Sequence, residues 1–226
     1  MESEIPGAGY VKQGFPAPGL RQIQRYITGY NEEGKGVFLS TDGGDHHRIM
    51  FGGRAVSNIL YSTQETPVEL NGEVDVAKAK DKEVRHSQLS LLLFPRLLLM
   101  VVFMCMANQM VVNGQPPLHY HNGSIVRMVD FAPGVESPMH RALSIDYGIV
   151  LEGVFELELD SGEVRIMREG DVSVNRACAH KWKNITGGGT LPGRMIYILL
   201  DCNDVIVNGQ KVEGHLGALE ADYVGR

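Results

Sequence analysis

His140 and His180 are the two residues of this chain best suited to chemistry. An imidazole can bind a metal ion, or take up and release a proton near neutral pH. The two histidines lie forty positions apart, and the segment between them has the pattern of strands joined by glycine turns. Strand pairing can therefore bring both imidazoles onto the inner wall of a small β-barrel.

A β-hairpin is predicted between the two histidines. Residues 155–159 alternate apolar and acidic side chains, and residues 164–166 alternate apolar and basic ones, which indicates strands with one dry and one wet face. A two-residue loop at 161–162 would place Glu158 opposite Arg165 as a cross-strand ion pair. An ordinary hairpin of a β-sandwich explains this stretch equally well, but it does not explain a histidine close to each end.

Three neighbours of the histidines have predicted positions. Arg141 follows His140 directly, so its side chain points to the opposite face of the strand, where we expect a structural ion pair. Tyr147 and Trp182 are candidates for the wall of a pocket, because barrel mouths are commonly lined by aromatic groups. Core packing is an equally good interpretation of both aromatic residues.

Composition limits the class of protein and its partners. The chain has 226 residues, of which 43% are hydrophobic and 21% charged, so we expect one folded domain with extensions. The net charge of −6 argues against a nucleic acid or a membrane as partner. Three cysteines without metal-finger spacing suit a reducing compartment, and the first residues lack the features of a secretory signal. We therefore expect a cytoplasmic location.

The chain divides into five predicted segments. These are an extended N-terminal arm at 1–23, N-terminal strands packing on the barrel at 24–83, a hydrophobic insertion at 84–115, the barrel core at 116–202 and a C-terminal tail at 203–226. The hydrophobic pattern predicts strands at 25–29, 37–40, 48–51, 58–62, 124–131, 147–152, 155–159, 164–167, 172–174, 194–200 and 205–207. A short helix is predicted within 65–82.

The leucine- and methionine-rich segment 84–115 does not fit the strand pattern around it. A transmembrane helix needs about 20 apolar residues, but Pro95 and Arg96 split the run. A buried helix is a second interpretation. The third is a translated, retained intron, because the codon for Val84 begins with GT and Gln115 can be encoded by CAG. We favour this third hypothesis, which sequencing of the spliced transcript tests directly.

The motifs around the two histidines resemble those of the cupins. Gly134 precedes His140 by six positions and Gly153 closes this first motif, while Gly170 precedes His180 by ten positions in the second. The stretches 25–40 and 137–184 are similar to a subgroup of small single-domain cupins from fungi and bacteria. This resemblance implies an all-β fold, a cupin barrel of the double-stranded β-helix or jelly-roll type, with an N-terminal extension.

The cupin pattern also implies a metal site. His140, His180 and Asp146 match three of its four usual ligands, although an aspartate replaces the usual glutamate and Ala142 stands where a second histidine is usual. Two imidazoles and one carboxylate suit Fe(II), with Mn or Zn as alternatives. Glu136, four residues before His140, is a possible replacement ligand. The alternative is a barrel without metal, in which His140 and His180 are hydrogen-bonding residues of a pocket.

Relatives in this subgroup are often labelled cupin-domain oxidoreductases of fungal secondary-metabolite pathways. The resemblance therefore implies a metal-dependent tailoring enzyme that acts on a small polyketide or aromatic intermediate, with His140, His180 and Asp146 as catalytic residues. The alternatives are a lyase, isomerase or dehydratase that moves protons without redox chemistry, and a non-catalytic barrel that binds a small ligand. Because cupins usually pair through their barrels, we also expect a homodimer.

Overall fold

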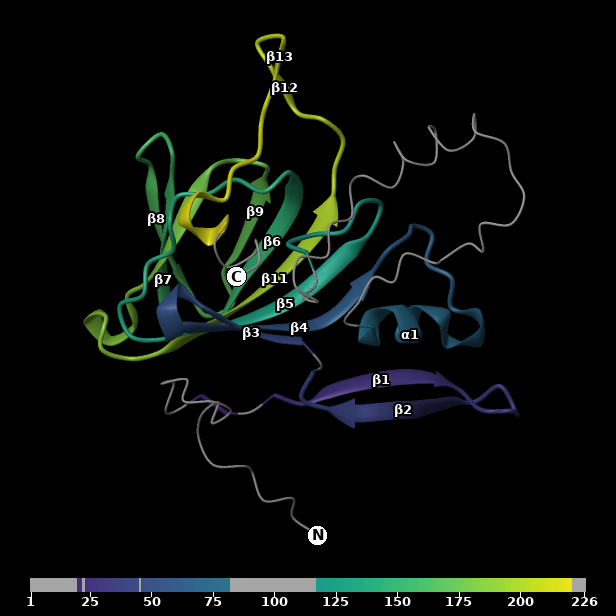
Figure 1. Ribbon diagram of the computed structural model, residues 1–226. Coiled ribbons are helices and arrows are strands. Elements are labelled where there is room, and N and C mark those ends of the chain that lie inside the picture. Colours follow the sequence, from purple (N-terminus) through teal and green to yellow (C-terminus); the bar gives the residue numbers. More distant parts are fainter. Residues whose placement is uncertain (1–19, 22, 45, 82–116, 221–226) are drawn as a thin grey trace.

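The computed structural model describes residues 20–21, 23–44, 46–81 and 117–220 (Figure 1). The expectation of an all-β fold is confirmed. The strands are β1 (Arg25–Tyr30), β2 (Gly36–Asp42), β3 (His46–Met50), β4 (Ala55–Thr63), β5 (Ser124–Phe131), β6 (Ser144–Glu152), β7 (Val154–Leu159), β8 (Val164–Arg168), β9 (Val172–Arg176), β10 (His180–Asn184), β11 (Gly193–Asp201), β12 (Ile206–Val207) and β13 (Gln210–Lys211). The helix α1 (Val74–Lys80) is short, and 3₁₀ turns occupy Phe51–Gly53, Asn71–Glu73, Thr186–Gly188 and Gly217–Leu219. Within these described ranges, no helix has the length and apolar character needed to cross a membrane.

Two antiparallel sheets enclose the core. The larger sheet has the order β3-β4-β5-β11-β6-β9, and the smaller has the order β10-β7-β8. Side chains from both sheets meet in one buried cluster, in which Phe131 of β5 and Met195 of β11 pack with Phe155 of β7 and Trp182 of β10. This arrangement is a sandwich closed toward a barrel, and its interior lies between the sheets.

The N-terminal strands take two different positions. Strands β3 and β4 continue the large sheet, because β4 pairs with β5 from Ala55↔Phe131 to Thr63↔Ser124. Strands β1 and β2 form a separate hairpin. Arg25 of β1 donates two hydrogen bonds to Asp42, at 2.7 and 2.9 Å, and a third, of 2.8 Å, to the carbonyl of Leu60 in β4. This buried guanidinium therefore fixes the hairpin to the large sheet. The predicted arm up to residue 19 and the predicted insertion 84–115 lie outside the described residues.

The hairpin of β7 and β8 differs from the predicted register by one residue. Its loop has three residues, since the Leu159 N–H donates to the Glu163 carbonyl at 2.9 Å. Gly162 adopts the left-handed conformation, with φ +84°, which this longer loop requires. The prediction was wrong because the extra loop residue cannot be recognised from alternation alone.

A one-residue slip reverses which side chains of β8 point inward. Ile166 is 46% exposed, whereas Met167 is buried and pairs with Phe155. The predicted pair of Glu158 with Arg165 is therefore not formed. Glu158 instead lies 3.1 Å from Lys181 of β10.

Strand β10 and the two-residue strand β13 were not predicted from the sequence pattern. His180, Trp182 and Asn184 are buried, while Lys181 and Lys183 alternate with them on the other face. The strand pairs with β7, with His180 beside Leu159 and Trp182 beside Leu157. Polar residues occupy both faces of β10, so it lacks the apolar alternation by which the other strands were found.

Candidate functional site

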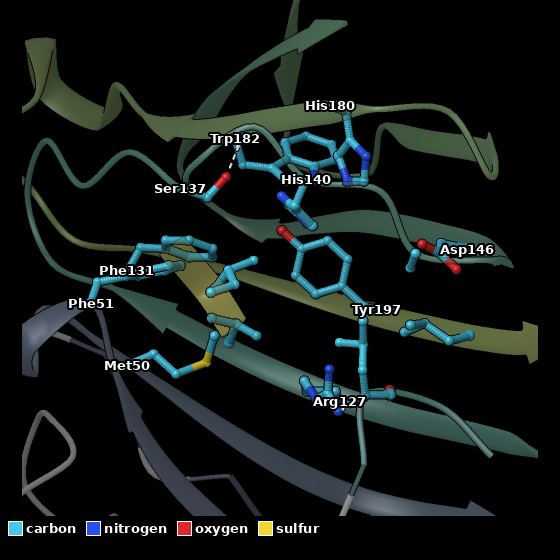
Figure 2. A pocket seen from close by; sticks show the side chains of 15 residues that line it. Met50, Phe51, Arg127, Phe131, Ser137, His140, Asp146, His180, Trp182 and Tyr197 are labelled. Atoms are coloured by element: carbon cyan, nitrogen blue, oxygen red, sulfur yellow. Dashed lines mark hydrogen bonds between the residues drawn. The ribbon is translucent and has the colours of Figure 1, made fainter. Parts of the chain in front are cut away.

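A cavity lies between the two sheets and is lined by four of the predicted site residues, His140, Asp146, His180 and Trp182 (Figure 2). Most of its lining is apolar or aromatic. Its polar lining residues are Arg127, Ser137, His140, Asp146 and His180. A largely apolar cavity with a few converging polar groups is typical of a binding site for a small molecule.

The fold brings His140 and His180 together. The segment before His140 runs antiparallel to β10, and the backbones of the two histidines exchange hydrogen bonds of 2.9 Å in both directions. The centroids of the two imidazoles are 4.4 Å apart. Figure 2 shows both rings beside Trp182 and above Tyr197. The sequence therefore identified the two histidines that the structure places side by side on the cavity wall.

Burial keeps both imidazoles neutral at pH 7. Removal from water and the charge of a protonated His140 together lower the pKa of His180 to about 4, against the opposing effect of the Cys178 carbonyl. Burial likewise lowers the pKa of His140, although its hydrogen bond to the Pro138 carbonyl acts in the opposite direction. A neutral imidazole can accept a hydrogen bond through one nitrogen and donate one through the other.

Asp146 lines the same cavity but lies apart from the imidazoles (Figure 2). It extends from β6, where the Ser144 hydroxyl donates a hydrogen bond to its carboxylate. Burial raises the pKa of Asp146 to about 6, against the opposing effects of the Ser144 hydrogen bond and the Arg127 charge. Across the described residues, no group of three or more His, Cys, Asp or Glu side chains is placed to hold a metal ion. The ligand set predicted from His140, His180 and Asp146 is therefore not assembled.

Glu136, predicted as a possible replacement ligand, does not line this cavity. Its backbone forms an isolated bridge with Lys183 of β10, and its side chain is exposed. The carboxylate lies 2.7 Å from the Lys181 ammonium and 3.5 Å from that of Lys183. The hydrogen bond from Lys181 lowers the pKa of Glu136. Because the lysines of β10 point outward, this pairing holds Glu136 on the outer surface.

The two aromatic candidates have different positions. Trp182 lines the cavity and is 4% exposed, and its ring meets that of Tyr197 edge-on at 6.0 Å. Tyr147 is not a cavity residue, so its prediction as one was wrong. It follows Asp146 directly on β6, and adjacent residues of a strand point to opposite faces. The tyrosine of the cavity is Tyr197 of β11.

Tyr197 and Arg127 are among the cavity residues that sequence reasoning missed. Tyr197 alternates with the buried Met195 and Leu199, a pattern that places all three on one face of β11. Arg127 is 5% exposed and donates hydrogen bonds to the carbonyls of Pro117 and Leu118, at 3.2 and 3.1 Å. The alternation of β5 could have identified this arginine as an inward residue. Arg141 forms the predicted structural ion pair, with Asp160 at 3.1 Å.

Comparison with known proteins agrees with this architecture. The cupin-domain-containing oxidoreductase srdD of Neurospora crassa is 57% identical over 219 residues, which cover 96% of this chain and 95% of that protein. The chain belongs to the cupin-domain-containing oxidoreductases. This cupin is also 34% identical over 205 residues to the phomopsin biosynthesis cluster protein D of Diaporthe leptostromiformis, covering 91% of this chain and 92% of that protein.

Two further comparisons were made. No protein-family profile matches the chain. Among solved structures, a cupin 2 conserved barrel domain protein from Salinispora arenicola is 26% identical, covers 35% of this chain and 64% of that chain, and has a TM-score of 0.31. The resemblance to cupin oxidoreductases noted in the sequence is confirmed by the relatives.

Proposed function

We propose that this cupin is a tailoring oxidoreductase that acts on a small polyketide or aromatic intermediate of a fungal biosynthetic pathway. The names of its relatives support the proposal, since they include an oxidoreductase and a biosynthesis cluster protein. The observation that carries it is the pair of adjacent imidazoles on the wall of a largely apolar cavity.

The cavity walls suit a flat, apolar substrate. Phe131, Trp182 and Tyr197 present ring faces and edges, with which an aromatic ligand can form offset or edge-on contacts. The space inside is about 70 Å³, roughly half of the ~150 Å³ cavity known to hold benzene. We therefore propose that the substrate inserts its reacting end and leaves the remainder toward the mouth.

The buried polar groups would orient that reacting end. The Trp182 Nε1–H is buried and has no hydrogen-bond partner among the described residues. A buried donor without a partner costs about 1–3 kcal/mol, so a substrate oxygen that accepts this hydrogen bond would gain affinity. His140 and His180 would then exchange protons with the substrate, while the two electrons of the oxidation pass to molecular oxygen or another small-molecule oxidant. The proposal assigns no step to a metal ion, because the described residues offer two imidazoles and no third ligand beside them.

Binding can be measured through the cavity itself. Trp182 is the only tryptophan of the chain, so its fluorescence reports on the cavity without a label. We expect phenol and small aromatic ketones to change this fluorescence in the full chain, and His140→Gln and His180→Gln to weaken the response. His121→Gln is the matched control, because the His121 side chain is 62% exposed and does not line the cavity.

Turnover requires the natural substrate. The full chain would be incubated with a small-molecule extract of the source organism in which the gene is disrupted, and the products followed by mass spectrometry. We expect a compound whose mass changes by two hydrogens or one oxygen, and no such change with His180→Gln. Ligand binding with no compound changed by the wild-type chain would contradict an oxidoreductase and favour a binding protein.

A further inference from the structure

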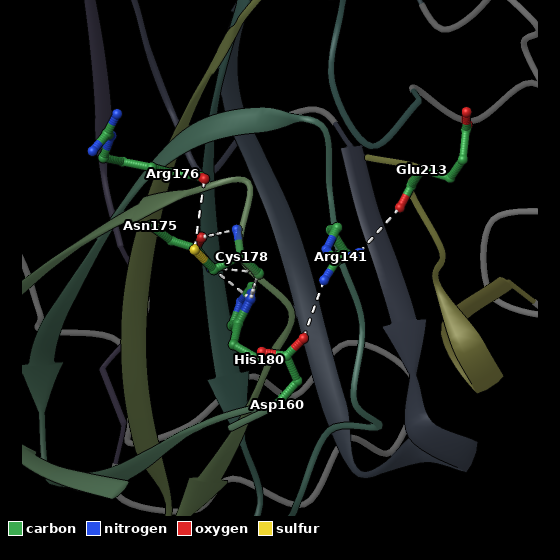
Figure 3. A network of polar contacts seen from close by, with 7 residues as sticks. All are labelled: Arg141, Asp160, Asn175, Arg176, Cys178, His180 and Glu213. Atoms are coloured by element: carbon green, nitrogen blue, oxygen red, sulfur yellow. Dashed lines mark hydrogen bonds and ion pairs between the residues drawn. The ribbon is translucent and has the colours of Figure 1, made fainter. Parts of the chain in front are cut away.

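Asn175 of β9 lies beside His180 (Figure 3). Its side-chain Nδ2 is 2.6 Å from Nδ1 of His180 and 3.1 Å from the carbonyl oxygen of Cys178. Its Oδ1 accepts a hydrogen bond of 2.8 Å from the backbone N–H of Cys178. The amide therefore joins the imidazole to the turn that precedes β10.

The backbone of Cys178 decides which way the Asn175 amide points. A backbone N–H can only donate, so the atom that faces it must be Oδ1. The other end of the amide is then the NH₂ group, which has two hydrogens for two neighbours. The NH₂ group lies 3.1 Å from the Cys178 carbonyl and 2.6 Å from Nδ1 of His180, and toward either neighbour it can only donate. The Cys178 carbonyl also lies 3.0 Å from this ring nitrogen, but the shorter contact is the one from Asn175.

The tautomers of the two histidines follow from these contacts. Because Nδ1 of His180 accepts from Asn175, the proton of the neutral ring is on Nε2. In His140 the opposite holds, because Nδ1 lies 2.9 Å from the Pro138 carbonyl, which can only accept, and Nε2 is left without a proton. No hydrogen bond from the described residues reaches either Nε2 atom.

We propose that Asn175 is a positioning residue that holds His180 in its Nε2–H tautomer, so that the pair offers one donor and one acceptor to a ligand hydroxyl. The hydroxyl would donate to Nε2 of His140 and accept from Nε2–H of His180. Carbonyls lack the donor and ethers lack it as well, so alcohols and phenols are the class selected. This inference rests on the proposed function for its substrate, but the tautomer of His180 stands independently of it.

The same tautomer explains why the site does not match a cupin metal centre. Coordination through Nε2 requires the imidazole proton on Nδ1, donated to a carbonyl or a carboxylate. The Cys178 carbonyl offers Nδ1 an acceptor at 3.0 Å, but the Asn175 amide lies closer, at 2.6 Å, and offers it a hydrogen. His180 is therefore held as a hydrogen-bond donor and not as a ligand.

Substitution of Asn175 by aspartate tests the assignment. A carboxylate keeps the Oδ1 acceptor for Cys178 but can only accept from the ring, so Asn175→Asp should move the His180 proton to Nδ1. Asn175→Ala should have the same effect, because Nδ1–H would then donate to the Cys178 carbonyl. Asn31→Asp is the matched control, since Asn31 is exposed and its Oδ1 already accepts from Glu33 and Lys35 N–H groups.

The first readout is the tautomer, observed by long-range ¹H–¹⁵N correlation spectra of the ¹⁵N-labelled full chain at pH 7. We expect Nε2–H for His180 in the wild type and in Asn31→Asp, and Nδ1–H in both Asn175 variants. Nδ1–H in the wild type would overturn the proposal. So would an unchanged tautomer in both Asn175 variants, provided that their spectra show a folded chain.

The second readout is the binding of phenol, followed by Trp182 fluorescence. Loss of one hydrogen bond predicts binding about tenfold weaker in Asn175→Asp than in Asn31→Asp, with anisole, which has no hydroxyl, bound equally by both. Equal phenol affinity in the two variants would overturn the selection of a hydroxyl. If neither compound binds any version while the tautomers are as expected, the proposed function fails and the assignment of Asn175 stands.

Discussion

Removal of the buried Arg194 guanidinium should destabilise the fold strongly. Arg194 of β11 lies opposite Asp130 of β5, and its Nε and Nη2 donate to the two carboxylate oxygens at 2.6 and 2.8 Å. Each of the two residues is 1% exposed. Burial raises the pKa of Asp130 even though Arg194 lowers it. Arg194→Met would therefore leave a carboxylate in a dry site without its cation.

The magnitude follows from the desolvation of that carboxylate. Breaking a buried ion pair by removal of one partner costs about 3–5 kcal/mol, whereas replacing both partners by neutral groups is often close to neutral. We expect a loss of this size in the free energy of unfolding for Arg194→Met at pH 7. We expect the double variant Asp130→Asn with Arg194→Met to recover most of it.

Urea unfolding followed by Trp182 fluorescence measures both quantities. The loss in Arg194→Met should become smaller from pH 8 to pH 5, because the unpaired Asp130, with its pKa raised further, takes up a proton in the folded state. Arg165→Met is the control, since its side chain is 74% exposed and its contact with Glu163 is 3.7 Å, and we expect a change below about 0.5 kcal/mol. A loss below about 1 kcal/mol in Arg194→Met, or an equal loss in the double variant, would refute the reasoning.

Three other predictions concern the cavity and its turns. Burial raises the pKa of Asp146 from 3.8 to about 6, so its charged form is disfavoured in the fold above pH 6 and this penalty disappears below about pH 4. Asp146→Asn should then raise the free energy of unfolding by up to roughly 3 kcal/mol at pH 8 and by little at pH 4, and equal effects at both pH values in urea titrations would contradict this. Gly153→Ala should cost about 2 kcal/mol or more, because φ is +97° and a Cβ would collide with the Thr186 side chain, whereas Gly162→Ala, at φ +84° in open space, should cost only about 1 kcal/mol in thermal unfolding. Elemental analysis of the purified full chain should find iron, manganese and zinc well below one ion per chain, since two imidazoles without a third ligand bind weakly; near-stoichiometric metal that is lost in both His140→Ala and His180→Ala would restore the ligand set predicted from the sequence.

Much of the strand pattern was accessible from the sequence, because most strands carry apolar residues on one face. Residues 124–131 were predicted with the bounds that β5 has. Strand β10 was not predicted, because its inward residues are His180, Trp182 and Asn184 and two lysines lie between them. Its identity as a strand depends on pairing with β7, a contact that no local pattern contains.

The site was predictable in its parts and not in its geometry. Motif spacing identified His140 and His180, and the structure pairs them in an isolated bridge at the start of β10. The position of Asp146 relative to the two imidazoles depends on its hydrogen bond with Ser144 and on where β6 places it along the cavity. Spacing in the sequence does not give that position. Tyr147 was predicted to face the cavity, but its neighbour Asp146 does so. Asn175 was overlooked because an asparagine near a strand end usually signals a turn.

The pairing of β4 with β5 has a consequence for the chain between them. Thr63 ends β4 directly beside Ser124, the first residue of β5, and their hydroxyls are 2.9 Å apart. Residues 64–123 therefore leave the sheet and rejoin it at adjacent positions. The register between β4 and β5 does not depend on the number of residues between them. Hydrogen bonds fix both ends of the segment that contains 84–115, because His46 contacts the Ala79 carbonyl and Arg127 donates to the Pro117 carbonyl. Deleting 84–115 would leave only residues 82, 83 and 116 between Asp81 and Pro117, a connection that reaches at most about 14 Å. The separation of these two ends, and not the sheet register, therefore decides whether a gene that splices out this segment encodes the same barrel.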